Sequence, residues 1–203
     1  MTNVRELFGD IDIYLFDQIL KNRFSSEMKI LDAGCGGGRN LIYFLRGGYR
    51  VFGVDQDAGA IEQVRLLAET LAPNPPVENF QISPVEKMPF QDESFDAVIS
   101  SAVLHFARDE THFNRMLGEM WRVLKPDGIF FARLASSIGI ENQIKFVGDG
   151  RYLLPDGSER FLVDEELLDS LTIQMGGIWL EPLKTTNVQN LRCMTTWVLR
   201  KGG

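Results

Sequence analysis

Hydrophobic and polar segments alternate along residues 29–135 in the order strand, helix, strand. The runs KILDAG (29–34) and RVFGVD (50–55) are short, partly β-branched, and end at small or acidic residues. Such runs are typical of parallel strands buried on both faces. The same pattern predicts further strands at ENFQIS (78–83), FDAVISS (95–101) and IFFARLA (129–135).

Apolar residues recur at helical spacing in the segments between these strands. A short helix within residues 39–48 is expected to end at Gly47 and Gly48, and two longer helices to begin after the capping residues Asp57 and Asp109. The second of these places an apolar stripe against the core and His112 toward solvent. The spacing of Leu7, Ile11, Leu15 and Ile19 predicts one helix ahead of the first strand.

The C-terminal third departs from this rhythm. KPDG (125–128) predicts a turn, residues 136–162 an irregular insertion holding a hairpin, and VDEELLDSL (163–171) a helix. IWLEPLKTT (178–186) and LRCMTTWVLRK (191–201) predict a closing pair of strands. The whole pattern favours a single α/β domain over residues 1–203. We expect a doubly wound, Rossmann-like sheet of about seven strands, mostly parallel with an antiparallel last strand, and helices on both faces.

Composition narrows the classes of partner. The net charge of −7 and the scattered basic residues disfavour nucleic acid, and no apolar run approaches the length of a membrane span. Cys35 and Cys193 lie far apart, no secretory segment follows the start, and Cys–His metal spacing is absent. We therefore expect a cytoplasmic protein, monomeric or homodimeric, that acts on a small molecule and holds no metal.

The stretch LDAGCGGGRN (31–40) places glycines directly behind the first predicted strand. A dinucleotide fingerprint requires a glycine where Arg39 stands, and no Gly-Lys-Ser/Thr follows for a phosphate loop. Gly34, Gly36 and Gly38 would let the backbone lie against a cofactor without phosphates. A tight strand-to-helix turn is the alternative interpretation.

Four segments together resemble the class I S-adenosylmethionine-dependent methyltransferases, in particular the type 11/25 group. They are LDAGCGGG (31–38), VDQD (54–57), VEKMPFQDESFDAVISSAVLHF (85–106) and WRVLKPDGIFF (121–131). GCGGGRN and the final LRCMTTWVLRK also resemble, more weakly, the tellurite-resistance-type branch that acts on small molecules.

The resemblance implies S-adenosylmethionine as cofactor and S-adenosylhomocysteine as product. Asp55 is placed to accept both ribose hydroxyls, with a turn or helix-capping role as the alternative. Pro84 stands where the family usually carries an acidic residue for the adenine amino group, and Ser83 or Glu86 is the possible substitute. The expected cofactor-binding residues are Asp32, Gly34, Cys35, Gly36, Gly38, Asn40, Asp55, Gln56, Ser83, Val85, Ser100 and Ser101.

Methyl transfer from a sulfonium depends mainly on alignment, and a base is needed only where the acceptor must lose a proton. His105, just after the fourth strand, is the candidate catalytic base, or else a histidine packed on the following helix. Signatures of nucleic-acid methyltransferases are absent from SSAVLHF (100–106). The expected substrate-binding residues are Tyr14, Arg133, Arg151, Tyr152, Arg160 and Arg192.

The resulting hypothesis is direct in-line methyl transfer to a small molecule, with residues 1–24 as a lid and 136–162 on the substrate side. Two alternatives stay open. The first is a methyltransferase-like protein that binds S-adenosylmethionine without transferring its methyl group. The second is a nicotinamide-dependent reductase of the same architecture.

Overall fold

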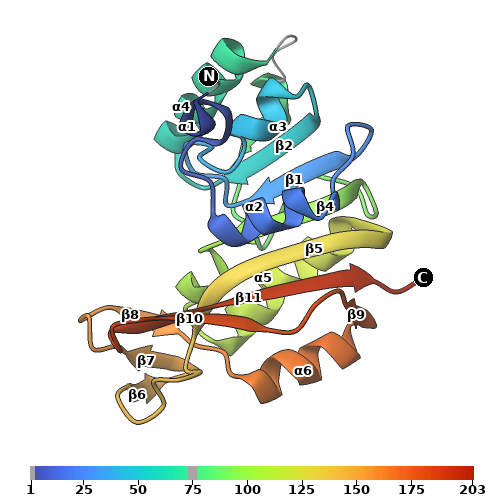
Figure 1. Ribbon diagram of the computed structural model, residues 1–203. Helices are drawn as coiled ribbons and strands as arrows, with labels where there is room; N and C mark the ends of the chain where they lie inside the picture. Colours follow the sequence, from blue (N-terminus) through green and yellow to red (C-terminus); the bar gives the residue numbers. More distant parts are fainter. Residues whose placement is uncertain (1–2, 73–76) are drawn as a thin grey trace.

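The computed structural model describes residues 3–72 and 77–203 and contains, within them, an eight-stranded sheet (Figure 1). The strand order is β10-β11-β5-β4-β1-β2-β3, with β9 paired to β11. Strands β1 to β5 run parallel, whereas β9, β10 and β11 are antiparallel additions. The strands are β1 (Lys29–Ala33), β2 (Arg50–Asp55), β3 (Phe80–Ile82), β4 (Phe95–Ser101), β5 (Leu124–Ser136), β9 (Gly177–Trp179), β10 (Lys184–Val188) and β11 (Arg192–Lys201).

Successive residues of each central strand enter opposite hydrophobic cores, because side chains alternate across a sheet. Ile30 and Phe131 pack with helices α2 (Ile13–Leu20), α3 (Ile42–Arg46) and α4 (Ala58–Leu71). Their neighbours Leu31 and Phe130 pack with α5 (Glu110–Val123) and α6 (Glu165–Gln174) on the other face. Figure 1 shows α2 in front of the sheet and α5 behind it. The structure thus has the doubly wound α/β fold that the sequence predicts.

Acidic residues begin the main helices, as the sequence predicts. Asp57 Oδ1 accepts the Gly59 N–H at 2.7 Å at the start of α4. Asp109 Oδ1 accepts the His112 N–H at 2.6 Å at the start of α5. Asp164 caps α6 in the same way through the Leu167 N–H. Each cap satisfies backbone donors that the first turn of a helix leaves unpaired.

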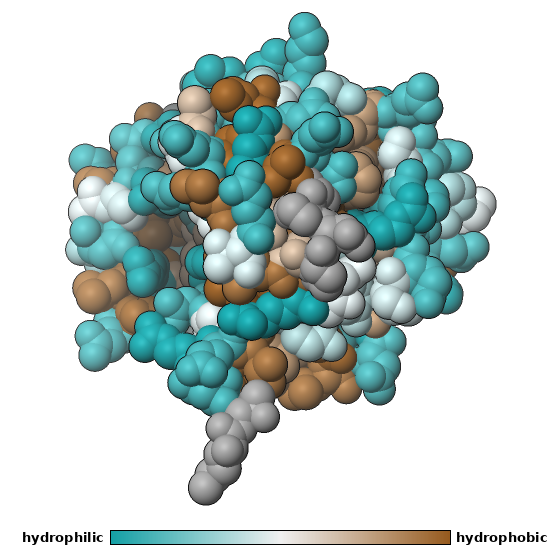
Figure 2. Space-filling view, turned by 90° about the horizontal axis from the view of Figure 1, so that it is seen from above, coloured by the Kyte–Doolittle hydropathy of each residue, from teal (hydrophilic) through white to brown (hydrophobic). Residues whose placement is uncertain are grey.

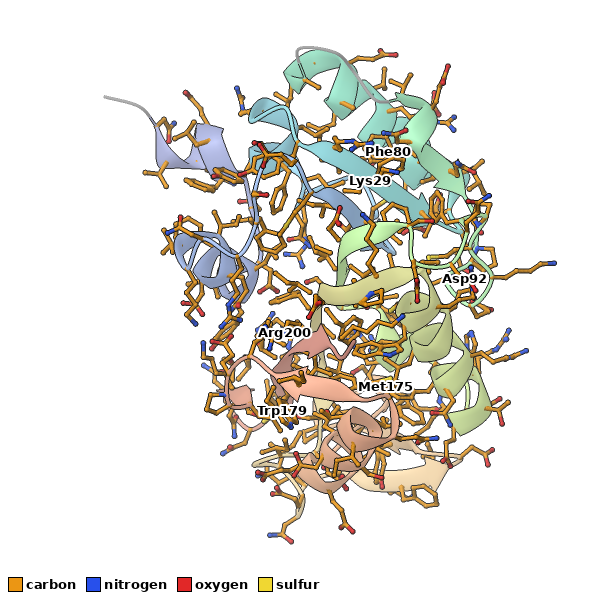
Figure 3. All side chains as sticks on the ribbon, turned by 90° about the vertical axis from the view of Figure 1, so that its right-hand side faces the viewer. Lys29, Phe80, Asp92, Met175, Trp179 and Arg200 are labelled. Carbon is orange, nitrogen blue, oxygen red and sulfur yellow. The ribbon has the colours of Figure 1, made fainter. Side chains whose placement is uncertain are left out.

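Strand order reverses between β1 and β4, the position at which open α/β sheets bind ligands beyond the carboxyl ends of their strands. At the opposite edge of the sheet, where β1 and β4 begin, polar contacts tie the strands together. Asp96 on β4 accepts the Lys29 N–H at 2.8 Å and forms an ion pair with Lys125 at 2.7 Å. Figure 3 places Lys29 and Phe80 in the half of the molecule formed by β1, β2 and α4, away from Met175 and Trp179. The carboxyl ends of β1 and β4 are therefore the expected position of a functional site.

The prediction of a single N-terminal helix is wrong. The segment forms α1 (Val4–Phe8) and α2, separated at Gly9, whose φ of 61° is incompatible with a continuing helix. Asp12 begins the second helix by accepting the Tyr14 N–H at 2.9 Å. The apolar spacing alone does not reveal this break. Residues 1–2 of the expected lid lie outside the described residues.

Three C-terminal expectations also need correction. Residues 125–128 do not separate α5 from a strand that starts at Ile129; they lie within β5 as an irregular stretch, with Asp127 at φ 61°. The insertion is an ordered antiparallel sheet of β6 (Lys145–Gly148), β7 (Arg151–Leu153) and β8 (Glu159–Phe161), more than the hairpin expected. The segment 178–186 is divided between β9 and β10, because both strands pair with β11 and residues 180–183 connect them.

The surface of the protein has both hydrophilic and hydrophobic regions. Figure 2 shows one face covered mainly by hydrophilic residues, with separate hydrophobic patches. In the described part of the chain, no helix combines the length and apolar character that a membrane crossing requires. The same residues contain no group of three or more His, Cys, Asp or Glu side chains arranged around a metal position.

Phe131 tests the proposed packing because its side chain is fully buried between β5 and the α2–α4 layer. We expect Phe131→Ala to lower the free energy of unfolding by about 3–5 kcal/mol, through lost burial and the cavity left behind. Phe146→Ala, at a largely exposed ring, should change it by no more than about 0.5 kcal/mol. Urea unfolding measures both, and equal effects would contradict the packing described.

Candidate functional site

The glycine loop after β1 is forced into close contact with its neighbours. Gly34 and Gly38 have φ values of +87° and +85°, which side chains rarely adopt. A Cβ on Gly34 would lie 2.5 Å from Val103 Cγ2, and one on Gly38 would lie 2.7 Å from Val64 Cγ2. At Gly36, by contrast, no described atom lies within 4 Å of a built Cβ. The loop is therefore tightly packed at both ends and leaves open space beside Gly36.

Asp55, at the end of β2, is held against this loop. Its Oδ2 accepts the Gly36 N–H at 2.9 Å, and its Oδ1 accepts the Asp57 N–H at 2.9 Å. Each carboxylate oxygen has a further lone pair for a ligand hydroxyl. Asp57, and not Asp55, caps α4. Asp55 therefore makes the local turn contact of the alternative interpretation through Oδ1 and does not cap the helix, and its carboxylate stays placed for the predicted ribose-binding role.

Three cavities meet at the carboxyl edge of the sheet. The inner cavity has a volume of about 260 Å³ and is lined by residues that include Asp55, Gln56 and Val85. The loop cavity, about 450 Å³, lies along residues 34–37 and is also lined by Asn40 and Ser101. The outer cavity, about 340 Å³, is lined by residues of β5, β11 and the insertion.

Ala102 lines all three cavities, and Phe106 lines both the inner and the outer one. Ala102 has a φ of 63°, an uncommon value for a residue with a side chain. Its N–H donates to the Arg133 carbonyl at 2.7 Å, which links the end of β4 to β5. A ligand in the inner cavity and one in the outer cavity would therefore face each other across Ala102 and Phe106.

The carboxylate of Asp32 is buried and has no hydrogen-bond partner in the part of the chain that the structure describes. Its side chain is 1% exposed, and neither oxygen has a hydrogen-bond partner among residues 3–72 and 77–203. Burial raises the pKa of Asp32 to about 7, and the nearby Arg39 charge opposes that shift. An unpaired buried acceptor is costly. Such a group suits a ligand that brings its own donors or positive charge.

Buried Asp12 contacts three predicted site residues that the sequence does not connect, one through its backbone N–H and two through its carboxylate. The Asp12 N–H donates to Asn40 Oδ1 at 3.0 Å. Its Oδ2 accepts from Ser101 Oγ at 3.2 Å and from Arg133 Nη1 at 3.1 Å. The Arg133 guanidinium also lies 5.3 Å from the centre of the Tyr14 ring. Asp12 was missed because its only sequence signal is that of a helix cap.

Pro84 lines the inner cavity, and the two candidate substitutes for the usual acidic residue lie close to it in the chain. The Ser83 hydroxyl donates to the Lys87 carbonyl at 2.8 Å, and Ser83 is not among the residues that line the inner cavity. Glu86 lines the inner cavity beside Pro84, and its Oε1 lies 3.1 Å from His112 Nε2. Of the two substitutes that the sequence left open, the geometry favours Glu86.

The expectation that His112 faces solvent is wrong. His112 is 8% exposed, lines the inner cavity, and accepts the Arg108 N–H at its Nδ1 at 3.1 Å. It lies beside Glu86, and Val85 and Met88 share a hydrophobic core with Phe113 and Met116 of the same helix, α5. No local sequence signal distinguishes this position from a solvent-facing one on the same helix.

His105 is also buried, in a short 3-10 turn (Leu104–Phe106), and lines the outer cavity. Burial, and then the charges of Arg160, Arg133 and Arg192, lower its pKa to about 4. Its Nδ1 accepts the Ala135 N–H at 3.2 Å, so the neutral ring carries its proton on Nε2. This state supplies a hydrogen-bond donor, whereas a general base needs a free nitrogen lone pair.

The remaining predicted residues divide into those at the cavities and those away from them. Arg133, Arg160 and Arg192 line the outer cavity together. Arg151 lies in the small sheet, with its Nε 2.8 Å from Glu159 Oε1, and Tyr152 packs there on Phe146 with ring centres 5.2 Å apart. Neither is among the cavity residues. Cys35 lines the loop cavity, and Ser100 is buried in β4 without lining a cavity.

Comparison with known proteins identifies the family of this chain. A family model described as a methyltransferase domain matches residues 31–132, just over half of the chain. An uncharacterized methyltransferase of Bacillus subtilis, YodH, is 37% identical over 123 residues, which cover 60% of this chain and 46% of that protein. A ubiquinone biosynthesis O-methyltransferase of Bradyrhizobium is 27% identical over 168 residues, 76% of this chain and 63% of that protein.

Solved structures share the fold. A methyltransferase of Methanosarcina mazei superposes with a TM-score of 0.72 at 23% identity, covering 91% of this chain and 97% of the other. The Burkholderia thailandensis 1,6-didemethyltoxoflavin-N1-methyltransferase, solved with S-adenosylhomocysteine, gives 0.72 at 20% identity, covering 97% and 80%. This chain spans about half the length of the first curated relatives it matches.

The doubly wound sheet, its glycine loop and the acidic end of β2 define a Rossmann-like fold, and open sheets of this kind bind ligands where the strand order reverses. With the match over residues 31–132, the chain belongs to the class I S-adenosylmethionine-dependent methyltransferase family.

We expect Asp55→Ala to weaken binding of S-adenosylhomocysteine by at least about tenfold, because it removes the acceptor for a ligand hydroxyl and frees the Gly36 N–H. Titration calorimetry measures the affinity. Asp169→Ala, at an exposed position on α6, is the matched control and should bind as the wild type does. Unchanged affinity in Asp55→Ala would remove Asp55 from the site.

Glu86→Gln tests which group meets the adenine amino group. A carboxylate beside the cavity accepts from an amino group but opposes the carbonyl of the deaminated base. We expect the wild type to prefer S-adenosylhomocysteine over S-inosylhomocysteine, and Glu86→Gln to reduce that preference by about tenfold. Glu69→Gln, exposed on α4, should keep it. An unchanged preference in Glu86→Gln would assign adenine recognition elsewhere.

Proposed function

We propose that this protein binds S-adenosylmethionine in the inner and loop cavities and transfers its methyl group to a small-molecule acceptor in the outer cavity. The observation that carries the proposal is the shared boundary: Ala102 and Phe106 line both the inner and the outer cavity. Methyl transfer needs donor and acceptor aligned across a short gap, and two adjoining cavities provide that arrangement.

The residues present suit the cofactor. Asp55 would accept the ribose hydroxyls, while Gln56, Val85 and Glu86 line the part of the inner cavity proposed for the base. The open backbone at Gly36 would lie along the methionyl part. Asp32, buried and without partners in the described chain, would receive donors from the amino-acid end, directly or through water.

When bound, the cofactor supplies an electrophilic methyl carbon on a positively charged sulfur. In a direct in-line displacement, residues of this chain would hold the acceptor atom behind that methyl carbon, opposite the sulfur, which would leave as a neutral thioether. The acceptor then loses its proton to solvent or to a base. The protein contributes chiefly position and the exclusion of water.

Residues of this chain would perform that positioning. His105, as a neutral Nε2–H donor, would orient the acceptor, in place of the base expected from the sequence. Asp12 fixes α2 to Ser101 and Arg133, so the N-terminal segment would act as a lid over the carboxyl ends of β4 and β5. Arg133, Arg160 and Arg192 would bind the acceptor.

The relatives support a small-molecule acceptor. One of them is named for ubiquinone biosynthesis, and one structural neighbour is an N1-methyltransferase solved with 1,6-didemethyltoxoflavin. Pro84, at the position where the family usually has an acidic residue, favours one alternative: a protein that binds the cofactor without transferring methyl groups.

Tritium transfer separates these two functions. Purified protein is incubated with S-adenosylmethionine labelled on its methyl group and with a fractionated metabolite extract, while calorimetry records binding of S-adenosylhomocysteine. The proposal predicts both binding and protein-dependent appearance of label in a small molecule. Asp55→Ala should lower both. Binding without any labelled product would favour the non-transferring alternative, and absence of binding would contradict the proposed function.

A further inference from the structure

The outer cavity combines basic side chains with an apolar wall. Its charged residues are Arg133, Arg160, Arg192 and Asp156, within a protein whose net charge is −7. Phe106, Leu154, Val188 and Met194 supply apolar surface on the same lining. The cavity therefore suits a molecule that has both a polar group and a hydrocarbon part.

Two of these arginines already have carboxylate partners. Arg133 Nη1 lies 3.1 Å from Oδ2 of the buried Asp12. Arg192 Nη1 lies 4.0 Å from Asp156 Oδ2, a looser pair at a side chain that is 57% exposed. Asp156 stays ionised near neutral pH, because its hydrogen bond with the Ser158 hydroxyl lowers its pKa. These two pairs leave the cavity electrically balanced apart from one residue.

Arg160 is that residue. Its Nη1 donates to the Glu159 backbone carbonyl at 2.8 Å, and its guanidinium lies 4.9 Å from the centre of the Phe106 ring. Neither contact neutralises its charge, and the described part of the chain gives it no ion pair. His105 adds no charge, because its imidazole is neutral at pH 7. The cavity thus holds one uncompensated positive charge beside a neutral donor.

We propose that the outer cavity binds an acceptor with a single carboxylate, held by Arg160 and Arg192, with its hydrocarbon part against Phe106, Leu154 and Met194. This inference rests on the proposed function, because it names the class of the methyl acceptor. Guanidinium groups match the planar carboxylate through paired hydrogen bonds. The loose contact between Arg192 and Asp156 leaves Arg192 able to turn to the ligand.

The charge count also excludes other classes. A cationic acceptor would be repelled by Arg160 and by the sulfonium of the cofactor across Ala102. A neutral acceptor would leave the Arg160 charge uncompensated in a partly buried position. A phosphate monoester, with nearly two negative charges, would place its second charge in the same cavity as the Asp156 carboxylate, which opposes it. An organic acid with one carboxylate fits the balance.

Benzoate is the probe, with benzamide as its neutral counterpart, phenyl phosphate as the dianion and benzylamine as the cation. Calorimetry is carried out on protein saturated with S-adenosylhomocysteine. We expect benzoate to bind at least about tenfold more tightly than benzamide, as one charge-assisted contact would give, and more tightly than phenyl phosphate or benzylamine.

The variant R160Q/R192Q should bind S-adenosylhomocysteine normally and lose the preference for benzoate over benzamide, whereas R160K/R192K should keep part of it. Arg200→Gln is the matched control, because Arg200 is exposed near the opposite end of β11 (Figures 1 and 3). Three results would overturn the inference. The wild type could bind benzoate and benzamide equally, R160Q/R192Q could keep the preference for benzoate over benzamide, or the wild type could bind phenyl phosphate more tightly than benzoate. If the wild type did not bind S-adenosylhomocysteine, that result would instead contradict the proposed function.

Discussion

The close approach of the β1 loop to its surroundings is the constraint on which the carboxyl edge of this protein depends. Gly34 meets Val103 after β4, and Gly38 meets Val64 on α4, at distances that leave no room for a Cβ. Both residues also need a left-handed backbone, which costs other residues roughly 1–2 kcal/mol. If this loop were displaced, the Gly36 N–H would leave Asp55, and the inner and loop cavities would lose a common wall.

The rest of the site is organised around that fixed loop by two links between strands. Ala102 joins β4 to β5 through its N–H and lines every cavity at the edge. Asp12 joins the N-terminal helix to Ser101 and Arg133 through its buried carboxylate and to Asn40 through its backbone N–H. Both links consist of short polar contacts in a buried setting, where a lost partner is expensive. Hydrogen bonds therefore join residues that line the loop cavity to residues that line the outer cavity.

Features that depend on neighbouring residues were predictable from the sequence. The caps at Asp57 and Asp109 and the position of Asp55 at the end of β2 follow from local spacing, and the structure has them. Features that depend on distant contacts were not. Buried His112 lies beside Glu86, 26 residues earlier in the chain, and Asp12 reaches partners 28 to 121 residues away. Arg151 looked equivalent to Arg160 in the sequence, yet the strand pairing directs it to Glu159.

The central claim is that the cofactor and the acceptor occupy adjoining cavities separated by Ala102 and Phe106. A crystal structure with S-adenosylhomocysteine bound tests this most directly. We expect the ribose hydroxyls on the Asp55 carboxylate and the sulfur atom facing the boundary with the outer cavity. S-adenosylhomocysteine bound away from Asp55, or with its sulfur turned away from Ala102 and Phe106, would contradict it.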